Sequence, residues 1–305
     1  MNNDLPHNLP TGTQILINAP VLNEVGKVAH PQGAVGVIIK VLDNDTYRIR
    51  FLDSFETVLS RNEIMTRKHF QRKGLQAQPD VVDYYQYIIF QCVTGSRAYG
   101  LDHDASDTDR RGIYLPPADL HWSLYGLPEQ IENHETEECY WELQKFISLA
   151  LKANPNILEC LYTPLIEKTT PLSEALIEQR EIFLSKLIYQ TYNGYVMSQF
   201  RKMNKHMEKH GRIKWKHAMH LIRLLISGIT VLQEGFVPVK VGTYREDLLA
   251  IRHGERSWEE VNQWRLSLNK EFEEAFKNTK LPEQPNYEAA NQFLIKARRE
   301  MVDNM

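Results

Sequence analysis

The chain has 305 residues, a formal net charge of −3, 42% hydrophobic residues and 25% charged residues. This composition excludes a disordered or collagen-like chain, and the near balance of charge excludes a uniformly basic nucleic-acid coat. At roughly 100 to 200 residues per domain, the length allows about two domains, and any electrostatic function has to be local.

Cysteine usage and the chain start indicate the compartment. The three cysteines, Cys92, Cys139 and Cys160, are widely spaced in apolar segments and form no CxxC pair, which is typical of a reducing compartment. The start, MNNDLPHNLPTG, has neither the basic nor the apolar region of a signal peptide. The longest apolar stretch, 218–232, is too short to cross a bilayer of about 30 Å. We therefore expect a soluble, cytoplasmic protein without a membrane partner.

Short strands are predicted for residues 1–66. The runs 33–42, 43–52 and 54–60 are β-branched or alternating and are separated by turn residues. Within YRIRF at 47–51, three apolar residues alternate with two arginines, so apolar groups and cations occupy opposite faces. Together with a preceding Pro-Gly loop, this pattern resembles SH3-like β-barrels of the KOW and Tudor type. Such a barrel could be a docking module for nucleic acid or protein. It could equally be a structural cover for another domain, with arginines that are simply solvated.

The rest of the chain predicts an α+β fold with two further parts. Residues 67–80 are polar and contain glycine and proline, which predicts a linker. Residues 81–165 hold several strand runs, and ECYWELQKFISLALKANP begins as a strand and continues as a helix, which predicts a mixed sheet with flanking helices. Residues 166–305 keep the helical period, so a helical C-terminal domain is expected.

The segment GSRAYGLDHDASDTDRRG, at 95–112, carries the chemistry. Gly95 lets backbone N–H groups approach a phosphate, and Ser96 adds a hydroxyl donor. Asp107 and Asp109 are one residue apart on a predicted strand, so their carboxylates project to the same side and can share a divalent cation. A phosphate cradle followed by paired carboxylates is what metal-assisted nucleotidyl transfer requires.

This motif carries a family resemblance. Gly-Ser, a spacer of about ten residues and Asp-x-Asp resemble the signature of the DNA polymerase beta-type nucleotidyltransferase superfamily. The longer string GSRAYGLDHDASDTDRRGIYLPP, with a later NPNILECLYTP, resembles the predicted nucleotidyltransferases of the RNA-repair-pathway polymerase-beta family, from about Tyr85 to His253. The segments 194–199, 216–223 and 249–254 resemble it too, whereas the N-terminal barrel lies outside the family core.

The resemblance implies a magnesium-dependent enzyme, with manganese as the alternative ion. It implies that Asp107 and Asp109 hold the metal and that a third carboxylate comes from the next strand. Glu137 and Glu138 both stand at the start of that strand and point to opposite sides, so the choice between them stays open. The implied reaction moves a nucleoside monophosphate from an NTP, such as ATP, to an acceptor hydroxyl, foremost an RNA 3′ end, and releases pyrophosphate.

A local positive field is predicted at 201–223, where eight lysines and arginines and four histidines occur with a single acid, Glu208. A solvated helix face also explains the lysines in its first half. Lys216, His220 and Arg223 lie in an apolar context, so they are expected to face the γ-phosphate side of the nucleotide. A histidine-metal cluster ranks second, because no carboxylate or cysteine completes it. The residues predicted to bind nucleotide are Gly95, Ser96, Arg97, Ser106, Arg111, Lys216, His220 and Arg223.

Two other functions remain open from the sequence. A non-catalytic nucleic-acid-binding or scaffolding protein would use the barrel and residues 201–223, and it would need no metal. An enzyme that transfers a nucleoside monophosphate to a protein hydroxyl would share the metal site with the RNA-directed enzyme. The acceptor identity, the preferred NTP and the oligomeric state are not encoded in these motifs.

Overall fold

The computed structural model describes residues 9–23, 25–43, 45–67, 69–70, 82–104 and 106–303. The chain divides into two compact units, and the second begins at Val82. Most of the predicted linker at 67–80 lies outside the described residues.

The N-terminal unit contains a five-stranded antiparallel sheet in the order β6-β5-β4-β1-β7. The predicted runs are confirmed as β4, β5 and β6, and in β5 Tyr47, Ile49 and Phe51 are buried while both arginines are exposed. The elements are β1 Gln14–Ile17, β2 Val21–Leu22, β3 Val28–His30, β4 Val35–Val41, β5 Thr46–Phe51, β6 Glu56–Ser60, η1 Arg61–Glu63 and β7 Ile64–Thr66.

The second unit is built on a mixed sheet, as predicted, and its strand order is β10-β11-β9-β8-β12. Strands β11 and β9 run parallel, and the other pairs are antiparallel. The strands and the two short helices beside β8 are η2 Tyr84–Tyr87, β8 Ile88–Thr94, α2 Gly95–Tyr99, β9 Asp109–Tyr114, β10 Gln130–Asn133, β11 Glu138–Glu142 and β12 Ile166–Lys168.

The strand register separates the two faces of this sheet. Thr94 lies opposite Asp109, and Cys92 lies opposite Arg111, so these four side chains share one face, which we call the cleft face. Arg110 and Glu138 lie opposite each other on the back face. The strands pack so closely that a Cβ at Gly112 would lie 1.9 Å from the Phe90 carbonyl oxygen, which explains the glycine there.

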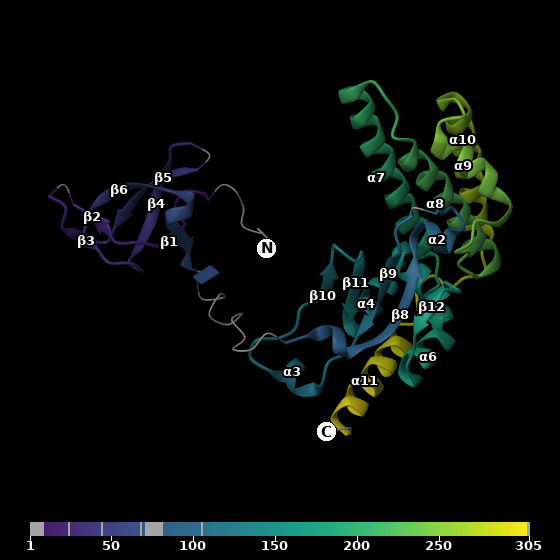
Figure 1. Ribbon diagram of the computed structural model, residues 1–305, viewed down its shortest axis with the longest axis horizontal. Helices are drawn as coiled ribbons and strands as arrows, with labels where there is room; N and C mark the ends of the chain where they lie inside the picture. The colour runs from purple at the N-terminus through teal and green to yellow at the C-terminus, as the bar shows by residue number, and fades with distance from the viewer. Residues whose placement is uncertain are drawn as a thin grey trace. The chain divides into compact units, whose positions relative to one another are not determined.

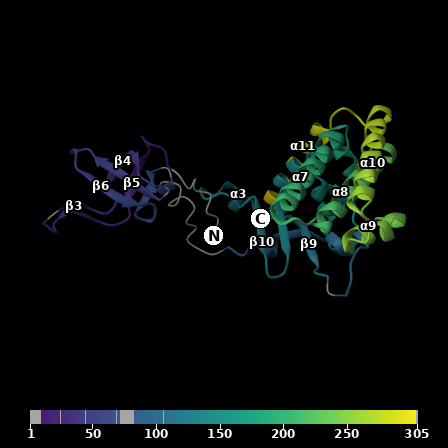
Figure 2. The same cartoon turned by 90° about the horizontal axis from the view of Figure 1, so that it is seen from above.

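Helices pack around one sheet in the second unit (Figure 1). Figure 2 shows α7, α8 and α10 on one side of β9 and β10. Helix α8 is the central one, because it packs against α7, α9 and α10 and its apolar residues are buried. The remaining elements are α3 Ala118–Trp122, α4 Leu143–Ala150, α5 Pro155–Tyr162, α6 Pro171–Glu178, η3 Arg180–Phe183, α7 Leu187–His210, α8 Trp215–Glu234, η4 Gly242–Tyr244, α9 Arg245–His253, α10 Trp258–Asn278 and α11 Tyr287–Asp303.

The larger of two hydrophobic clusters in this unit runs from Phe90 in the sheet to Ala297 in α11. The described residues on both sides of position 165 therefore contribute to the same core. Local sequence explains where the flanking helices start: Glu142 accepts hydrogen bonds from two N–H groups at the start of α4, and Asn154 precedes Pro155 at the start of α5. Among the helices that the structure describes, none is long and apolar enough to span a membrane.

Candidate active site

A cleft of about 380 Å³ opens at the end of the sheet where β8 leads into α2 and β9 begins. Sheet-side carboxylates and helix-side cations both line it. Eight of the twelve predicted site residues are among its lining residues: Gly95, Ser96, Ser106, Asp107, Asp109, Arg111, Lys216 and His220. The predicted residues that do not line it are Arg97, Glu137, Glu138 and Arg223.

Gly95 makes room for the Asp109 carboxylate. Its φ is +69°, a left-handed conformation, and a Cβ at this position would lie 2.1 Å from Asp109 Oδ2. Asp109 is the first residue of β9 and lies opposite Thr94, the last residue of β8. Any side chain at position 95 would therefore clash with Asp109 in addition to straining the backbone.

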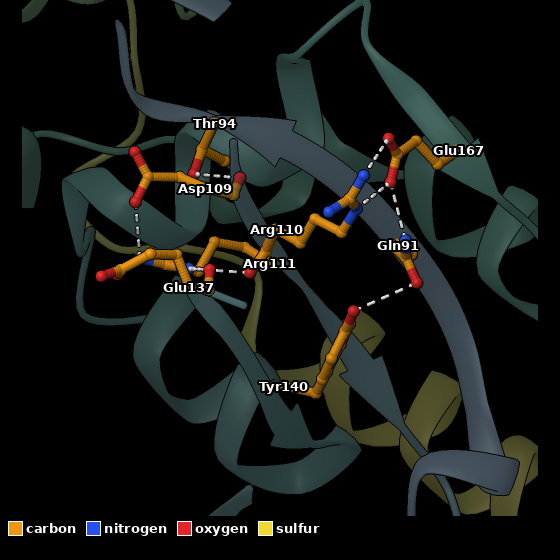
Figure 3. Close-up of polar contacts among 8 residues, drawn as sticks. All are labelled: Gln91, Thr94, Asp109, Arg110, Arg111, Glu137, Tyr140 and Glu167. Carbon is orange, nitrogen blue, oxygen red and sulfur yellow. Dashed lines mark hydrogen bonds and ion pairs between the residues drawn. The ribbon is translucent and has the colours of Figure 1, made fainter. Parts of the chain in front are cut away.

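Arg111 fixes the other oxygen of the same carboxylate. Its Nη2 lies 3.1 Å from Asp109 Oδ1, and its Nη1 donates to the carbonyls of Glu137 at 2.6 Å and Arg110 at 2.8 Å (Figure 3). The guanidinium thus ties Asp109 to the turn that precedes β11. The charge that Arg111 neutralises here is the Asp109 carboxylate.

Asp107 comes from a loop, not from a strand as the alternation argument assumed. Strand β9 begins only at Asp109, and the described residues between α2 and β9, 100–104 and 106–108, are here called the acid loop. The β8 partner strand ends at Thr94, opposite Asp109, so no strand continues the pairing beyond this point. The Ser106 carbonyl instead accepts a hydrogen bond from Arg97 Nη2 at 2.7 Å, and the Asp107 carbonyl accepts one from Arg97 Nε at 3.3 Å. Arg97 holds the acid loop and does not line the cleft.

The two glutamates considered for a third carboxylate lie outside the cleft lining. Glu138 lies opposite Arg110 and so belongs to the back face. Glu137 precedes β11 with a φ of +55°, and its carbonyl accepts hydrogen bonds from Arg111 Nη1 and from the Arg110 N–H. The β11 residue that lines the cleft is Trp141.

The aspartate pair suits a divalent cation that arrives with a nucleotide. Within the described residues, no group of three or more histidine, cysteine, aspartate or glutamate side chains could hold a metal alone. Mg²⁺ typically binds one or two carboxylates and completes its shell with phosphate oxygens and waters, and Mn²⁺ accepts the same oxygen ligands. Asp107 and Asp109 line one cleft and therefore fit this pattern as the protein's share of the ligands.

Helix α8 supplies a basic side to the cleft. Lys216, Met219 and His220 line the cleft and share one helix face, because they are three and four residues apart. Burial, reinforced by nearby Arg223 and Lys216, lowers the pKa of His220 to about 3. His220 is therefore neutral at pH 7, and Lys216 carries the positive charge of this helix at the cleft.

Arg223 has an anionic partner inside the protein, where the sequence predicted a phosphate. Its Nη1 lies 2.6 Å from Glu159 Oε1, and its guanidinium lies 3.7 Å from the centre of the Tyr99 ring. The Tyr99 hydroxyl donates to Glu159 Oε2 at 2.7 Å. Burial alone would lower the pKa of Arg223, but Glu159 more than offsets this and the pKa is raised. The three side chains tie together α2, α5 and α8 beneath the cleft.

Sequence reasoning missed several residues of the site. Glu159 and Tyr99 line the cleft, and so does Arg252 of α9. Each lies in a segment that carried the family resemblance, but no periodicity or spacing separated these residues from their neighbours.

Comparison with known proteins identifies the family. The model of the RNA repair pathway DNA polymerase beta family (RlaP) matches residues 63–296. The chain belongs to this family. The match extends past the predicted 85–253 at both ends and leaves out nearly all of the N-terminal sheet.

Individual relatives are more distant. Over 82 residues, the chain is 34% identical to a protein of Bacillus subtilis (strain 168) named Uncharacterized protein YcgL. The aligned segment makes up 26% of this chain and 32% of that protein. A solved structure described as a nucleotidyltransferase-like protein from Exiguobacterium sibiricum 255-15 matches over 76% of this chain and 79% of its own, with 14% identity and a TM-score of 0.27. Membership of the polymerase beta family therefore rests on the family match.

Proposed function

We propose that this protein transfers a nucleoside monophosphate from an NTP to an acceptor hydroxyl, foremost an RNA 3′ end, and releases pyrophosphate. One observation carries the proposal: the Asp109 carboxylate is packed against Gly95 in a cleft that also holds Asp107 and, on its helix side, Lys216. The Gly-Ser turn and the Asp-x-Asp motif are thus parts of a single site. The match to the polymerase beta family supports the same reaction class.

Each residue has a role that follows from its contacts. Gly95 and Ser96 offer an uncrowded backbone and a hydroxyl at the start of α2, where phosphate oxygens can accept hydrogen bonds. Lys216 balances the phosphate charge, and neutral His220 contributes a ring N–H without adding charge. When bound, Mg²⁺ or Mn²⁺ on Asp107 and Asp109 supplies charge neutralisation of the triphosphate. Arg111 keeps the Asp109 carboxylate oriented.

The reaction exchanges one phosphorus–oxygen bond for another. The acceptor oxygen forms a bond to the α-phosphorus as its proton leaves, and the bond from the α-phosphorus to the β-phosphate bridging oxygen breaks. Pyrophosphate departs with that electron pair. The cleft has to hold the triphosphate in line with the acceptor, so most of the catalytic effect arises from positioning and charge stabilisation.

A nucleic-acid acceptor is favoured by the segment 201–216, here called the basic arm, which forms the end of α7 and the start of α8. Its seven lysines and arginines are all exposed, and within the described residues none of them forms an ion pair. Elsewhere in the chain, exposed cations such as Lys277 and Lys296 pair with nearby glutamates. Unpaired cations on α7 and on the connection to α8, whose Lys216 lines the cleft, suit a phosphate backbone.

The N-terminal sheet is a second candidate for nucleic-acid contact, but its charge is partly neutralised. Arg50 pairs with Glu56 at 2.7 Å. We therefore assign the larger share of nucleic-acid binding to the basic arm.

The test uses NTPs labelled at the α-phosphate or at the γ-phosphate, with Mg²⁺ and either total cellular RNA or total cellular protein. Label that enters RNA from the α-position only, together with pyrophosphate release, is the expected result. Label in protein would replace the RNA acceptor by a protein hydroxyl. RNA binding without labelling, unaffected by metal removal, would support the non-catalytic alternative and overturn the proposal.

A further inference from the structure

Arg252 of α9 touches both sides of the cleft. It lines the cleft together with Lys216 and His220 of α8. Its Nη1 also donates to the carbonyl of Leu101 at 2.8 Å, and its Nη2 lies 3.5 Å from His103 Nε2. Both contacts are to the acid loop, which leads to Asp107.

This contact is one of three by which the helical part holds the end of α2 and the start of the acid loop. The carbonyls of Tyr99, Gly100 and Leu101 accept hydrogen bonds from the Val241 N–H at 3.1 Å, Arg245 Nε at 2.8 Å and Arg252 Nη1. At the other end of the loop, Arg97 holds the carbonyls of residues 106 and 107. The loop that carries Asp107 is therefore anchored at both ends.

Arg252 and Arg245 differ in whether the guanidinium has N–H donors left for a ligand in the cleft. Arg245 does not line the cleft, and its Nη1 lies 2.8 Å from Glu246 Oε1. Arg252 is half-buried and forms no ion pair with a carboxylate in the part of the chain that the structure describes. A guanidinium has five N–H donors, and the two contacts to the acid loop leave several of them for a ligand. A half-buried cation of this kind is stabilised by an anion in the cleft.

We propose that Arg252 binds the triphosphate of the nucleotide and at the same time positions the acid loop, so that one side chain couples nucleotide binding to the segment that carries Asp107. The inference rests on the proposed function and adds a residue that links the helical wall to the metal-binding wall. A planar guanidinium spreads five N–H donors over three nitrogens, so it reaches a carbonyl and a phosphate that lie further apart than the single nitrogen of a lysine ammonium can reach.

The test measures binding of α,β-methylene-ATP with Mg²⁺ by calorimetry in the full-length protein. This analogue cannot donate its α-phosphoryl group, so binding is separated from transfer. We expect Arg252→Gln to weaken binding by about 10- to 100-fold, since hydrogen bonds to charged groups are lost. Arg252→Lys keeps the charge and is expected to give an intermediate loss. Arg245→Gln is the matched control, because it removes a neighbouring loop contact outside the cleft, and its expected loss is less than about threefold.

Hydrogen exchange of residues 100–108 supplies a second readout. Addition of the analogue should slow exchange of this segment in the wild type and in Arg245→Gln, and it should have little effect in Arg252→Gln. Equal losses of affinity in both glutamine variants would show a merely structural role and overturn the inference, as would unchanged affinity in both Arg252 variants. A wild type that binds the analogue through Arg252 but transfers nothing from ATP would overturn the proposed function and leave the inference standing.

Discussion

Two adjacent arginines of β9 allow the two faces of the sheet in the second unit to be compared. Arg111, on the cleft face, lies 3.1 Å from Asp109, and Arg110, on the back face, lies 2.8 Å from Glu167 of β12 (Figure 3). The side chains of the two pairs are similarly exposed, at 25% and 32% for the first pair and 33% and 34% for the second. Neither the ion pair nor its burial therefore distinguishes a functional carboxylate from a structural one.

The surroundings of the two carboxylates differ. Glu167 accepts hydrogen bonds from Arg110 and Gln91, which hold its pKa below the usual range, and it lines no part of the cleft. Asp109 has one oxygen held by Arg111 and the other turned toward Gly95 in the cleft. On the cleft face, a carboxylate oxygen next to a second aspartate is thus left for a ligand, as the proposed metal site requires.

The largest expected effect is on the transfer rate, and it should come from Gly95→Ala on the cleft face. The new Cβ would displace the Asp109 carboxylate, and a shift of about 1 Å in a catalytic group lowers rates by about 100-fold. Gly100→Ala is the matched control, because Gly100 is also left-handed, at φ +71°, but has no atom within 4 Å of a built Cβ. Steady-state transfer rates would check this. Equal losses in both variants would show that backbone strain, not the position of Asp109, is responsible.

The second expected effect is on stability, and it compares a buried ion pair with a surface one. Glu159→Gln leaves the Arg223 charge buried without its partner, since the two side chains are only 2% and 7% exposed. We expect a loss of about 3 to 5 kcal/mol in the free energy of unfolding. Glu167→Gln on the back face should cost at most about 1 kcal/mol. Urea unfolding at pH 7 measures both values, and similar losses would contradict the assignment of the Tyr99, Glu159 and Arg223 cluster as the support of the cleft.

The smallest expected effect is on how the free energy of unfolding depends on pH. The folded chain keeps His220 neutral down to about pH 3, while an unfolded chain protonates histidine near its usual pKa of about 6.5. Below pH 6.5 the unfolded state therefore binds more protons, and the free energy of unfolding falls as the pH falls. Between pH 6.5 and 5, His220 should lower the free energy of unfolding by about 1 to 2 kcal/mol.

In His220→Asn the slope of stability against pH should be shallower than in the wild type over this range. Some slope should remain, because burial also lowers the pKa of His121, to about 4. Urea unfolding midpoints at several pH values test this. An identical slope in variant and wild type would show that His220 is not held neutral by its surroundings.

Local patterns predicted the elements well, and most of the residues that they singled out line one cleft. Alternation in 47–51 and the change from strand to helix after Glu142 are short-range signals, and both appear in the structure. The extent of β9 could not be predicted, because it depends on where the partner strand β8 ends, at Thr94 opposite Asp109.

Long-range partners were also beyond sequence reasoning. Arg223 meets Glu159 from 64 positions away, and Arg252 meets Leu101 from 151 positions away. Hydrophobic periodicity tells which side of a helix is buried, but it does not tell which charged residue of another element lies opposite. The expectation of a phosphate at Arg223 was reasonable chemistry, since a buried cation needs an anion.

The most direct test of the central claim compares the carboxylates of the two faces in one assay. Wild type, the double variant Asp107→Asn with Asp109→Asn, and Glu167→Gln would be incubated with α-labelled ATP, Mg²⁺ and RNA, after circular dichroism has shown that all three are folded. We predict that labelling is lost in the double variant and retained in Glu167→Gln. Undiminished labelling in the double variant would contradict the account.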